Sequence, residues 1–185
     1  MPFVRFLAGD YVWQWRRQTP LDNGIFGETR FLFGPNDHPE VDSEDWFVVF
    51  EDVPTGWTRA VDSSRCMFVC GEPPTVKQYP ARFLRQFGVV VTADPALRHR
   101  HRVTSERGLP WHVGMRVNQP DSYQNALRFS DFAASPAKTK LFSVICSDKA
   151  ITPWHRRRLR FVDQLMERLG DRIDRYGRGI KSIDD

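Results

Sequence analysis

Short apolar runs, each bounded by polar or turn-forming residues, recur along the chain. They lie at residues 3–8, 46–50, 67–70, 88–91 and 141–145. Runs of this length predict strands, and unbroken apolar character is typical of parallel strands that are covered on both faces. Residues 11–33 instead mix aromatic and arginine side chains with turn signals at Pro20 and Asn23, which predicts irregular structure.

A helix is predicted between the runs at 67–70 and 88–91. Pro80 suits its first turn. Apolar side chains follow at helical spacing, at Phe83, Leu84 and Phe87. Strand, helix and strand in this order form a βαβ unit, and its right-handed crossover makes the two strands parallel. Glu72 is therefore expected at the carboxyl end of a strand, the edge at which parallel sheets bind ligands.

A second strand, loop and helix are predicted near the end of the chain. The run at 141–145 predicts a buried strand, and a polar loop follows it. Thr152 is suited to cap a helix that begins at Pro153, and Gly170 ends its apolar periodicity. That periodicity is carried by Leu159, Val162, Leu165, Met166 and Leu169.

Basic side chains crowd the first turns of this predicted helix. They are His155, Arg156, Arg157, Arg158 and Arg160. Because the helix dipole disfavours cations at this end, the crowding indicates an anion such as phosphate. The alternative is a solvated basic face in which some arginines pair with Glu167 or Asp163.

Composition limits the classes of protein to consider. With 185 residues, 41% of them hydrophobic, the chain can bury a core. A net charge of +4 suits an anionic ligand or a membrane surface, but is small for a nucleic-acid-binding protein. Three cysteines without a C-x-x-C pair predict reduced, buried thiols and a reducing compartment. No run approaches the ~20 apolar residues of a membrane span, and the N-terminus lacks the apolar core of a signal peptide.

Two segments resemble the glycosyltransferase family that contains the α1,3-fucosyltransferases. They are KLFSVICSDKAITPWHRRRLRFVDQL, at residues 140–165, and DRIDRYGRG, at residues 171–179. The matched positions are Ser147, Lys149, Thr152, His155, Arg158, Tyr176, Gly177 and Gly179. Trp154 stands where the family has a glycine.

The resemblance implies an α/β, GT-B-like fold of two Rossmann-type halves. Residues 1–130 would form the acceptor domain, 131–139 a linker, and 140–185 the beginning of a donor domain for GDP-fucose. No Asp-x-Asp motif occurs in the sequence, so a transferase that needs a metal ion to hold the diphosphate is not expected. The donor-binding residues would be Ser147, Lys149, His155, Arg158 and Tyr176. Arg158 would clamp the pyrophosphate, because a planar guanidinium offers paired donors.

The implied reaction is inverting transfer of fucose to a glycan hydroxyl of N-acetylglucosamine type. Such a reaction needs a base for the acceptor hydroxyl, and the resemblance matches Glu72 to that role. Burial between two halves would raise the pKa of Glu72 towards working pH. On the residues alone, a brace for the Pro73-Pro74 turn is as well supported. The weaker alternatives are Asp10, Asp45, Glu51 and Asp52.

Acceptor contacts are assigned to aromatic side chains and one histidine. Trp13 and Trp15 suit stacking on sugar faces, and packing in a small satellite core is the alternative. His112 would touch acceptor or donor, unless it is a packed core histidine. The basic run at 98–102 predicts a solvated loop or a contact with phosphate or anionic lipid.

The chain ends at Asp185, before the family's Glu-Asn-Ser and Tyr-x-Thr-Glu-Lys donor motifs would occur. The expectation is therefore a fragment that alone transfers no sugar, binds GDP weakly, and self-associates through its incomplete donor domain. One rival interpretation is a non-catalytic module for glycan binding or interaction, and a less favoured one is a nucleic-acid-binding protein. The expected location is the bacterial cytoplasm, with peripheral contact at the inner membrane as an option.

Overall fold

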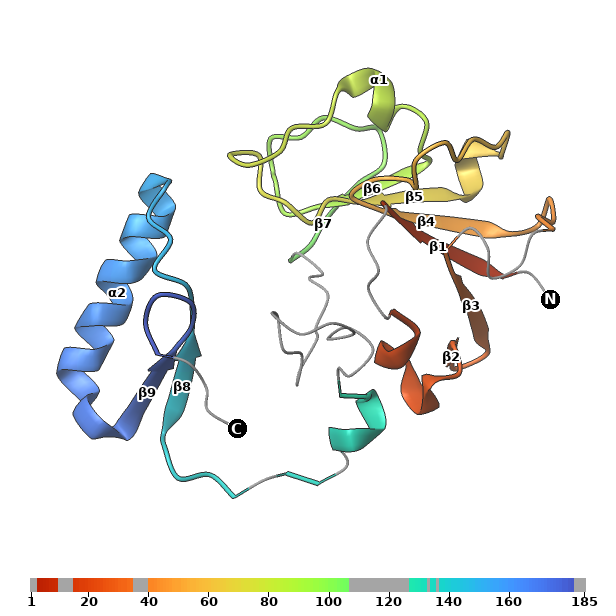
Figure 1. Ribbon diagram of the computed structural model, residues 1–185. Coiled ribbons are helices and arrows are strands. Elements are labelled where there is room, and N and C mark those ends of the chain that lie inside the picture. The colour runs from red at the N-terminus through yellow and green to blue at the C-terminus, as the bar shows by residue number, and fades with distance from the viewer. Residues whose placement is uncertain are drawn as a thin grey trace. The chain divides into compact units, whose positions relative to one another are not determined.

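The computed structural model describes residues 3–9, 15–34, 40–106, 127–132, 134–135 and 137–181. The chain divides into two compact units, Met1–Ala134 and Ser135–Asp185. Each combines helix with parallel strands, so the fold is α/β (Figure 1). The predicted linker at 131–139 contains the point of division.

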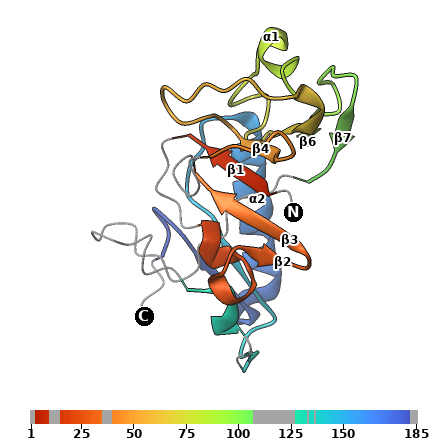
Figure 2. The same cartoon turned by 90° about the vertical axis from the view of Figure 1, so that its right-hand side faces the viewer.

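A seven-stranded sheet forms the first unit, in the order β2-β3-β1-β4-β5-β6-β7. The strands are β1 (Val4–Ala8), β2 (Ile25–Phe26), β3 (Thr29–Phe33), β4 (Trp46–Phe50), β5 (Cys66–Val69), β6 (Val89–Thr92) and β7 (Arg102–Thr104). Neighbours pair in parallel, except that β2 and β3 are antiparallel. The first unit is therefore built on a mostly parallel sheet (Figure 2).

Short helices join these strands. They are α1 (Ala81–Leu84) and the 3₁₀ turns Trp15–Gln18, Pro20–Asp22, Ser63–Arg65 and Phe129–Phe132. The predicted strands at 3–8, 46–50, 67–70 and 88–91 are confirmed to within about a residue at most of their ends. The predicted βαβ unit is also confirmed, because β5 and β6 pair in parallel on either side of α1.

The prediction of irregular structure across residues 11–33 is wrong for its second half. Residues 25–33 form β2 and β3, and β3 pairs with β1. In β3, exposed Arg30 stands between half-buried Thr29 and Phe31, so no continuous apolar run marks the strand. A strand of mixed polarity at one side of the sheet was therefore missed.

One face of the sheet carries the main core. It consists of Leu7, Phe47, Val49, Cys66, Phe68, Cys70, Leu84, Phe87 and Val90. Phe68 is 0% exposed. Its ring centroid lies 4.9 Å from that of Tyr79, 5.2 Å from Phe83 and 5.0 Å from Phe87. The α1 segment therefore packs on this face through aromatic contacts.

The opposite face is only partly covered by the described residues. On this face of β4, Phe50 is buried and Val48 is half-buried, whereas Trp46 is 47% exposed. Side chains of β5 and β6 on this face are half-buried, at Met67, Val69, Val89 and Val91. Complete cover of β4 on both faces, as its apolar run predicted, is confirmed only in part.

The second unit is a small βαβ arrangement. β8 (Phe142–Ile145) and β9 (Ile173–Tyr176) pair in parallel, and α2 (Pro153–Leu169) connects them through the 3₁₀ turn Gly170–Arg172. The predicted strand, the Thr152 cap and the helix that ends before Gly170 are all confirmed. β9 was not predicted, because Ile173 is its single aliphatic residue.

The second unit buries little apolar surface. Val162 and Ile173 are its buried residues within the described ranges. Ile145 in β8 is 71% exposed and Phe161 on α2 is 59% exposed. The prediction that β8 is buried is therefore wrong for this unit taken by itself.

Candidate functional site

Acidic residues gather at the carboxyl edge of the first sheet. β4, β5 and β6 are parallel, and Glu51, Glu72 and Asp94 follow them in the chain. In parallel sheets the carboxyl ends of the strands lie at one edge, where ligands bind. The prediction that Glu72 follows a strand at this edge is confirmed.

Glu51 joins the ends of β4 and β5. Its side chain is buried, and its backbone adopts φ of 66°, which is costly for a residue with a side chain. The Glu51 Oε1 atom accepts hydrogen bonds from the backbone N–H groups of Gly71 and of Glu72, the latter at 2.7 Å. Its Oε2 atom lies 3.3 Å from the Lys77 ammonium. These contacts compensate the strain and fix the backbone on which Glu72 stands.

The pKa of Glu51 lies below its ordinary value. Burial alone would raise this pKa, but the Tyr79 hydroxyl, the amides of Glu72 and Gly71, and Lys77 together outweigh it. The Tyr79 hydroxyl is buried beside this carboxylate and has no other partner among the described residues. The Glu51 carboxylate therefore positions the backbone of Gly71 and Glu72. Because its pKa is lowered, it is a poor general base.

Glu72 has the freedom that Glu51 lacks. Its side chain is exposed in the first unit, and its carboxylate has no hydrogen bond or ion pair with the described residues. It borders a cavity of about 260 Å³, whose lining includes Cys70, Lys77, Tyr79, Thr92, Asp94 and Arg98. The expected burial of Glu72 is not found in this unit by itself. The residue still combines a fixed backbone with an accessible carboxylate.

The other candidate bases have structural partners or lie elsewhere. Asp45 precedes β4, is 1% exposed, and forms a 2.6 Å ion pair with Arg5 Nε. Asp52 is exposed, and its Oδ1 atom accepts the Val53 N–H at 2.9 Å. Asp10 lies outside the described residues. Asp45 therefore stabilises the amino end of the sheet and takes no part in this edge.

Trp15 packs within the first unit. Its ring centroid lies 4.7 Å from that of Phe6 and 5.4 Å from that of Phe50, and the side chain is half-buried. Trp15 therefore packs in a small satellite core, which was the alternative to stacking on a sugar. Trp13 and His112, the other predicted acceptor contacts, lie outside the described residues.

The second cluster lies at the carboxyl ends of β8 and β9. The Cys146 N–H donates to the Tyr176 carbonyl at 2.9 Å, and the Asp148 N–H donates to the Arg178 carbonyl at 3.0 Å. The loop after β8 therefore runs beside the turn after β9. The two segments that carry the family resemblance, separate in sequence, meet here.

Three arginines near the start of α2 have partners close by, and two of them donate to the loop that precedes the helix. Arg158 Nη2 donates to the carbonyls of Ser147 at 3.0 Å and Lys149 at 3.4 Å. Arg156 Nη1 donates to the carbonyls of Ala150 and Ile151, at 2.9 and 3.3 Å.

The third of these arginines, Arg157, lies 5.4 Å above the Trp154 ring. Asp163 pairs with Arg175 at 2.7 Å. Arg156, Arg157 and Arg160 are exposed, as the alternative of a solvated basic face expects.

Arg158 and His155 thus shape the loop. Arg158 Nε is buried and lacks a hydrogen-bond partner in the described part of the chain. The His155 N–H donates to Thr152 Oγ1 at 3.2 Å, and His155 Nδ1 accepts the Thr152 N–H at 3.3 Å. This reciprocal cap fixes where α2 begins. Both residues are held in place before any ligand arrives.

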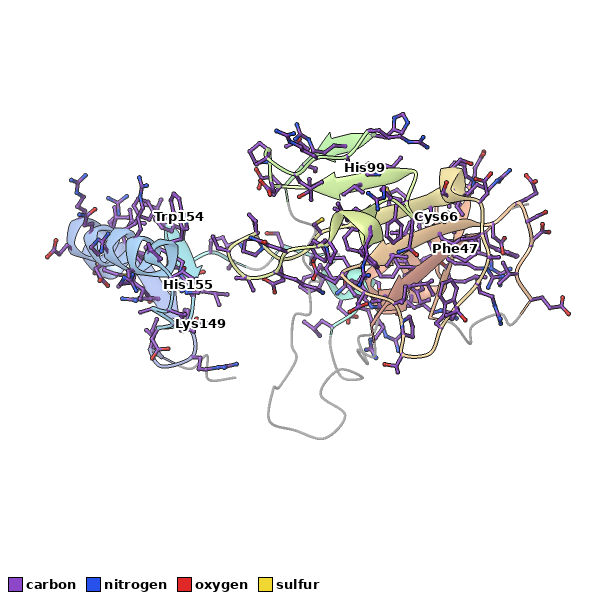
Figure 3. All side chains as sticks on the ribbon, turned by 90° about the horizontal axis from the view of Figure 1, so that it is seen from above. Phe47, Cys66, His99, Lys149, Trp154 and His155 are labelled. Atoms are coloured by element: carbon purple, nitrogen blue, oxygen red, sulfur yellow. The ribbon has the colours of Figure 1, made fainter. Side chains whose placement is uncertain are left out.

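Exposed cations remain next to this loop. The ammonium of Lys149 and the guanidinium of Arg178 are exposed and have no side-chain partner within the described ranges. Lys181 Nζ lies 5.3 Å above the Tyr176 ring. Figure 3 shows Lys149, Trp154 and His155 on the second unit. An anion placed at this loop would meet Lys149, Arg178 and the first turn of α2.

The cysteines are free thiols. Cys66 and Cys70 are buried as predicted, whereas Cys146 is only half-buried. Burial raises the pKa of Cys66 to about 11, so this thiol is unreactive at neutral pH. Within the described ranges, no group of three acidic, histidine or cysteine side chains could hold a metal ion. Nor does any described helix have the length and apolar character needed to cross a membrane.

Comparison with known proteins gave no relative. No protein-family model matches the chain, and neither a curated protein nor a solved structure matches it. The proposal below therefore depends on the geometry of the two clusters and on the resemblance of their residues to those of the glycosyltransferase family named above.

Proposed function

We propose that the protein is a fucosyltransferase-like glycosyltransferase of GT-B type. Its second unit would bind the diphosphate of GDP-fucose, and its first unit would bind the acceptor glycan. The observation that carries this proposal is the meeting of Ser147, Lys149 and Arg158 at one loop between β8 and α2. Tyr176 joins them from β9 through its carbonyl contact with Cys146.

This loop has the physical properties of a diphosphate site. It lies at the carboxyl ends of parallel strands and at the N-terminus of a 17-residue helix, where the helix dipole favours anions. Lys149 and Arg178 supply charge. Arg158 contributes by holding the Ser147 and Lys149 carbonyls, and so determines where the loop amides point.

Glu72 is the general base in this proposal. It would take the proton of the acceptor hydroxyl while that oxygen bonds to the anomeric carbon of fucose. The bond from that carbon to the diphosphate breaks on the opposite face, and GDP leaves with the electron pair. Glu51 supports this role by fixing the Glu72 backbone, as its hydrogen bond to the Glu72 amide indicates.

Calorimetric titration with GDP tests the donor site. We expect weak saturable binding, with a Kd on the order of 1 mM. Lys149→Gln should weaken binding severalfold, because it removes a charge beside the loop. Lys138→Gln is the matched control, since Lys138 is also exposed and precedes β8. GDP binding that is undetectable, or that is equal in the two variants, would contradict the proposed donor site.

Substitution of Glu72 tests the base. Glu72→Gln keeps the shape but cannot accept a proton, so any fucose transfer should fall by roughly 10²-fold while GDP affinity stays unchanged. If Glu72 only braces the turn, Gln should be nearly neutral for transfer, whereas Ala should lower the thermal midpoint. Normal transfer by the Gln variant would remove Glu72 from the reaction.

A further inference from the structure

A second cavity, of about 980 Å³, lies in the first unit and shares Leu97 and Arg98 with the lining of the Glu72 cavity. Three of its lining residues mark its place: Ser63 precedes β5, Phe87 precedes β6, and Arg102 opens β7. Each stands at the amino end of a strand. The cavity therefore faces the sheet edge opposite to the carboxyl edge that carries Glu51 and Glu72.

The cavity is strongly basic. Arginines line it at positions 85, 98, 100 and 102, and no aspartate or glutamate does. Arg85, Arg98 and Arg100 are exposed, and none of them forms an ion pair with a described carboxylate. Four like charges around one hollow repel each other, and a bound anion would relieve that repulsion.

Part of the cavity wall is held in a fixed conformation. Arg102 Nη1 donates to the carbonyls of Pro95 and Leu97, at 2.5 and 2.9 Å. His99 Nδ1 accepts the His101 N–H at 3.2 Å, so its proton is on Nε2, which donates to the Phe87 carbonyl at 3.1 Å. His99 thus fastens the loop to the end of α1 (Figure 3). Arg98 and Arg100, which flank His99, therefore lie on a loop whose backbone is held by hydrogen bonds.

We propose that this cavity binds a phosphate-bearing ligand, either a lipid headgroup or a soluble phosphate compound. Guanidinium groups bind phosphate through paired hydrogen bonds, and several of them match an anion of more than one charge better than a single carboxylate. The proposal does not depend on the proposed sugar transfer, because Arg85, Arg100 and Arg102 line this cavity and not the one that Glu72 borders. In a transferase, such a site would hold the protein against a phosphorylated acceptor or an anionic membrane.

The test compares two double variants of the full chain. Arg85→Gln with Arg100→Gln removes two cavity charges, and neither residue borders the Glu72 cavity. The control is Arg59→Gln with Arg82→Gln. Both control residues are exposed residues of the same unit that do not line the basic cavity. The two variants change net charge equally, so a difference between them reports the cavity itself.

Two probes distinguish the sources of phosphate. The first is inorganic pyrophosphate, titrated by calorimetry at about 50 mM salt, where screening is modest. The second is sedimentation with phosphatidylcholine vesicles that contain about 30 mol% phosphatidylglycerol. Binding of pyrophosphate indicates a soluble phosphate ligand, and binding of vesicles alone indicates a lipid headgroup.

In either case, we expect the cavity variant to bind the probe roughly tenfold more weakly than wild type. The control variant should stay within about twofold of wild type. Absence of binding to both probes would overturn the proposal. So would equal weakening in the two variants, which would indicate net charge alone, or unchanged binding in the cavity variant.

Discussion

The two units differ in how much they bury. The first has a seven-stranded sheet and a core of nine buried residues beneath α1. The second has two strands, one long helix and two buried residues within its described range. A sheet of two strands with a helix on one side leaves its other face open, and such an arrangement is marginal in water. The same βαβ pattern therefore has different stability in the two units.

The candidate sites reflect this difference. In the first unit, Glu51 is buried and holds the end of β5 with a carboxylate. In the second, Arg158 donates to carbonyls of the loop after β8. Gly177 lets the turn after β9 approach that loop, because a side chain there would meet the Cys146 carbonyl. A substitution in the first unit should therefore disturb folding, whereas one in the second should disturb the loop alone.

Hydrogen exchange should show the largest difference between the units. Amides of β5 should exchange only through global unfolding of the first unit, whereas those of β8 should exchange through local opening. We expect protection in β5 to exceed that in β8 by roughly 10³-fold or more. Equal, slow exchange in β8 of a dilute monomer would show that the second unit is stable by itself, contrary to this comparison.

Truncation of one phenylalanine in each unit should have unequal effects. Phe68→Ala removes a ring that is 0% exposed and contacts three other rings, so the first unit should lose about 3–5 kcal/mol of unfolding free energy. Phe161→Ala removes a ring that is 59% exposed and should cost less than about 1 kcal/mol. Urea unfolding followed by circular dichroism measures both. Similar losses would mean that Phe161 is covered in solution.

Asp45→Asn should destabilise the first unit in a pH-dependent way. The substitution removes the carboxylate charge that pairs with the buried Arg5 guanidinium, which should cost about 3 kcal/mol near pH 7. Burial alone would raise the pKa of Asp45, but hydrogen bonds from Arg5, Phe3 and Asp42 and the Arg5 charge lower it below its ordinary 3.8.

The sign of the pH dependence follows from this lowered pKa. The contribution of Asp45 is fully present above pH 3.8 and is lost as the pH falls through the lowered value. Urea midpoints of wild type and variant should therefore converge as the pH falls below 3.8 and through the lowered pKa of Asp45. A gap that stays constant into acid would show that the carboxylate charge is not what stabilises the sheet.

The sequence predicted the elements that are either uniformly apolar or regularly amphipathic. The runs that became β4 and β5 and the periodicity of α2 are of this kind. β3 and β9 were missed because arginines interrupt both strands, at Arg30 and Arg175. Edge and half-exposed strands carry mixed side chains, so local patterning detects them poorly.

The sequence was sufficient to predict where the candidate site residues lie in the fold, but not which contacts each of them makes. The apolar pattern predicted that Glu72 follows a strand. The family resemblance singled out Ser147, Lys149 and Arg158 as members of one site. The sequence did not indicate that Glu51 would accept the Glu72 amide, since that contact joins residues 21 positions apart. Nor did it show that Arg158 would hold carbonyls. The basic run at 98–102 was visible, but its cavity also needs Arg85 and Ser63, which only the fold brings beside it.

Gly177→Ala should have the most local effect of these substitutions. Gly177 has φ of 136°, and a Cβ at this position would overlap the Cys146 carbonyl. The turn after β9 would have to move away from the loop after β8, at a cost of about 1–3 kcal/mol confined to the second unit.

Because the loop would lose its partner, GDP binding should weaken, while the urea midpoint of the first unit should stay unchanged. Gly27→Ala is the control: Gly27 also has positive φ, at 59°, but a Cβ there meets no atom within 4 Å. That variant should cost about 1 kcal/mol in the first unit and leave GDP binding intact. If both variants weaken GDP binding equally, contact between the two loops is not what forms the anion site.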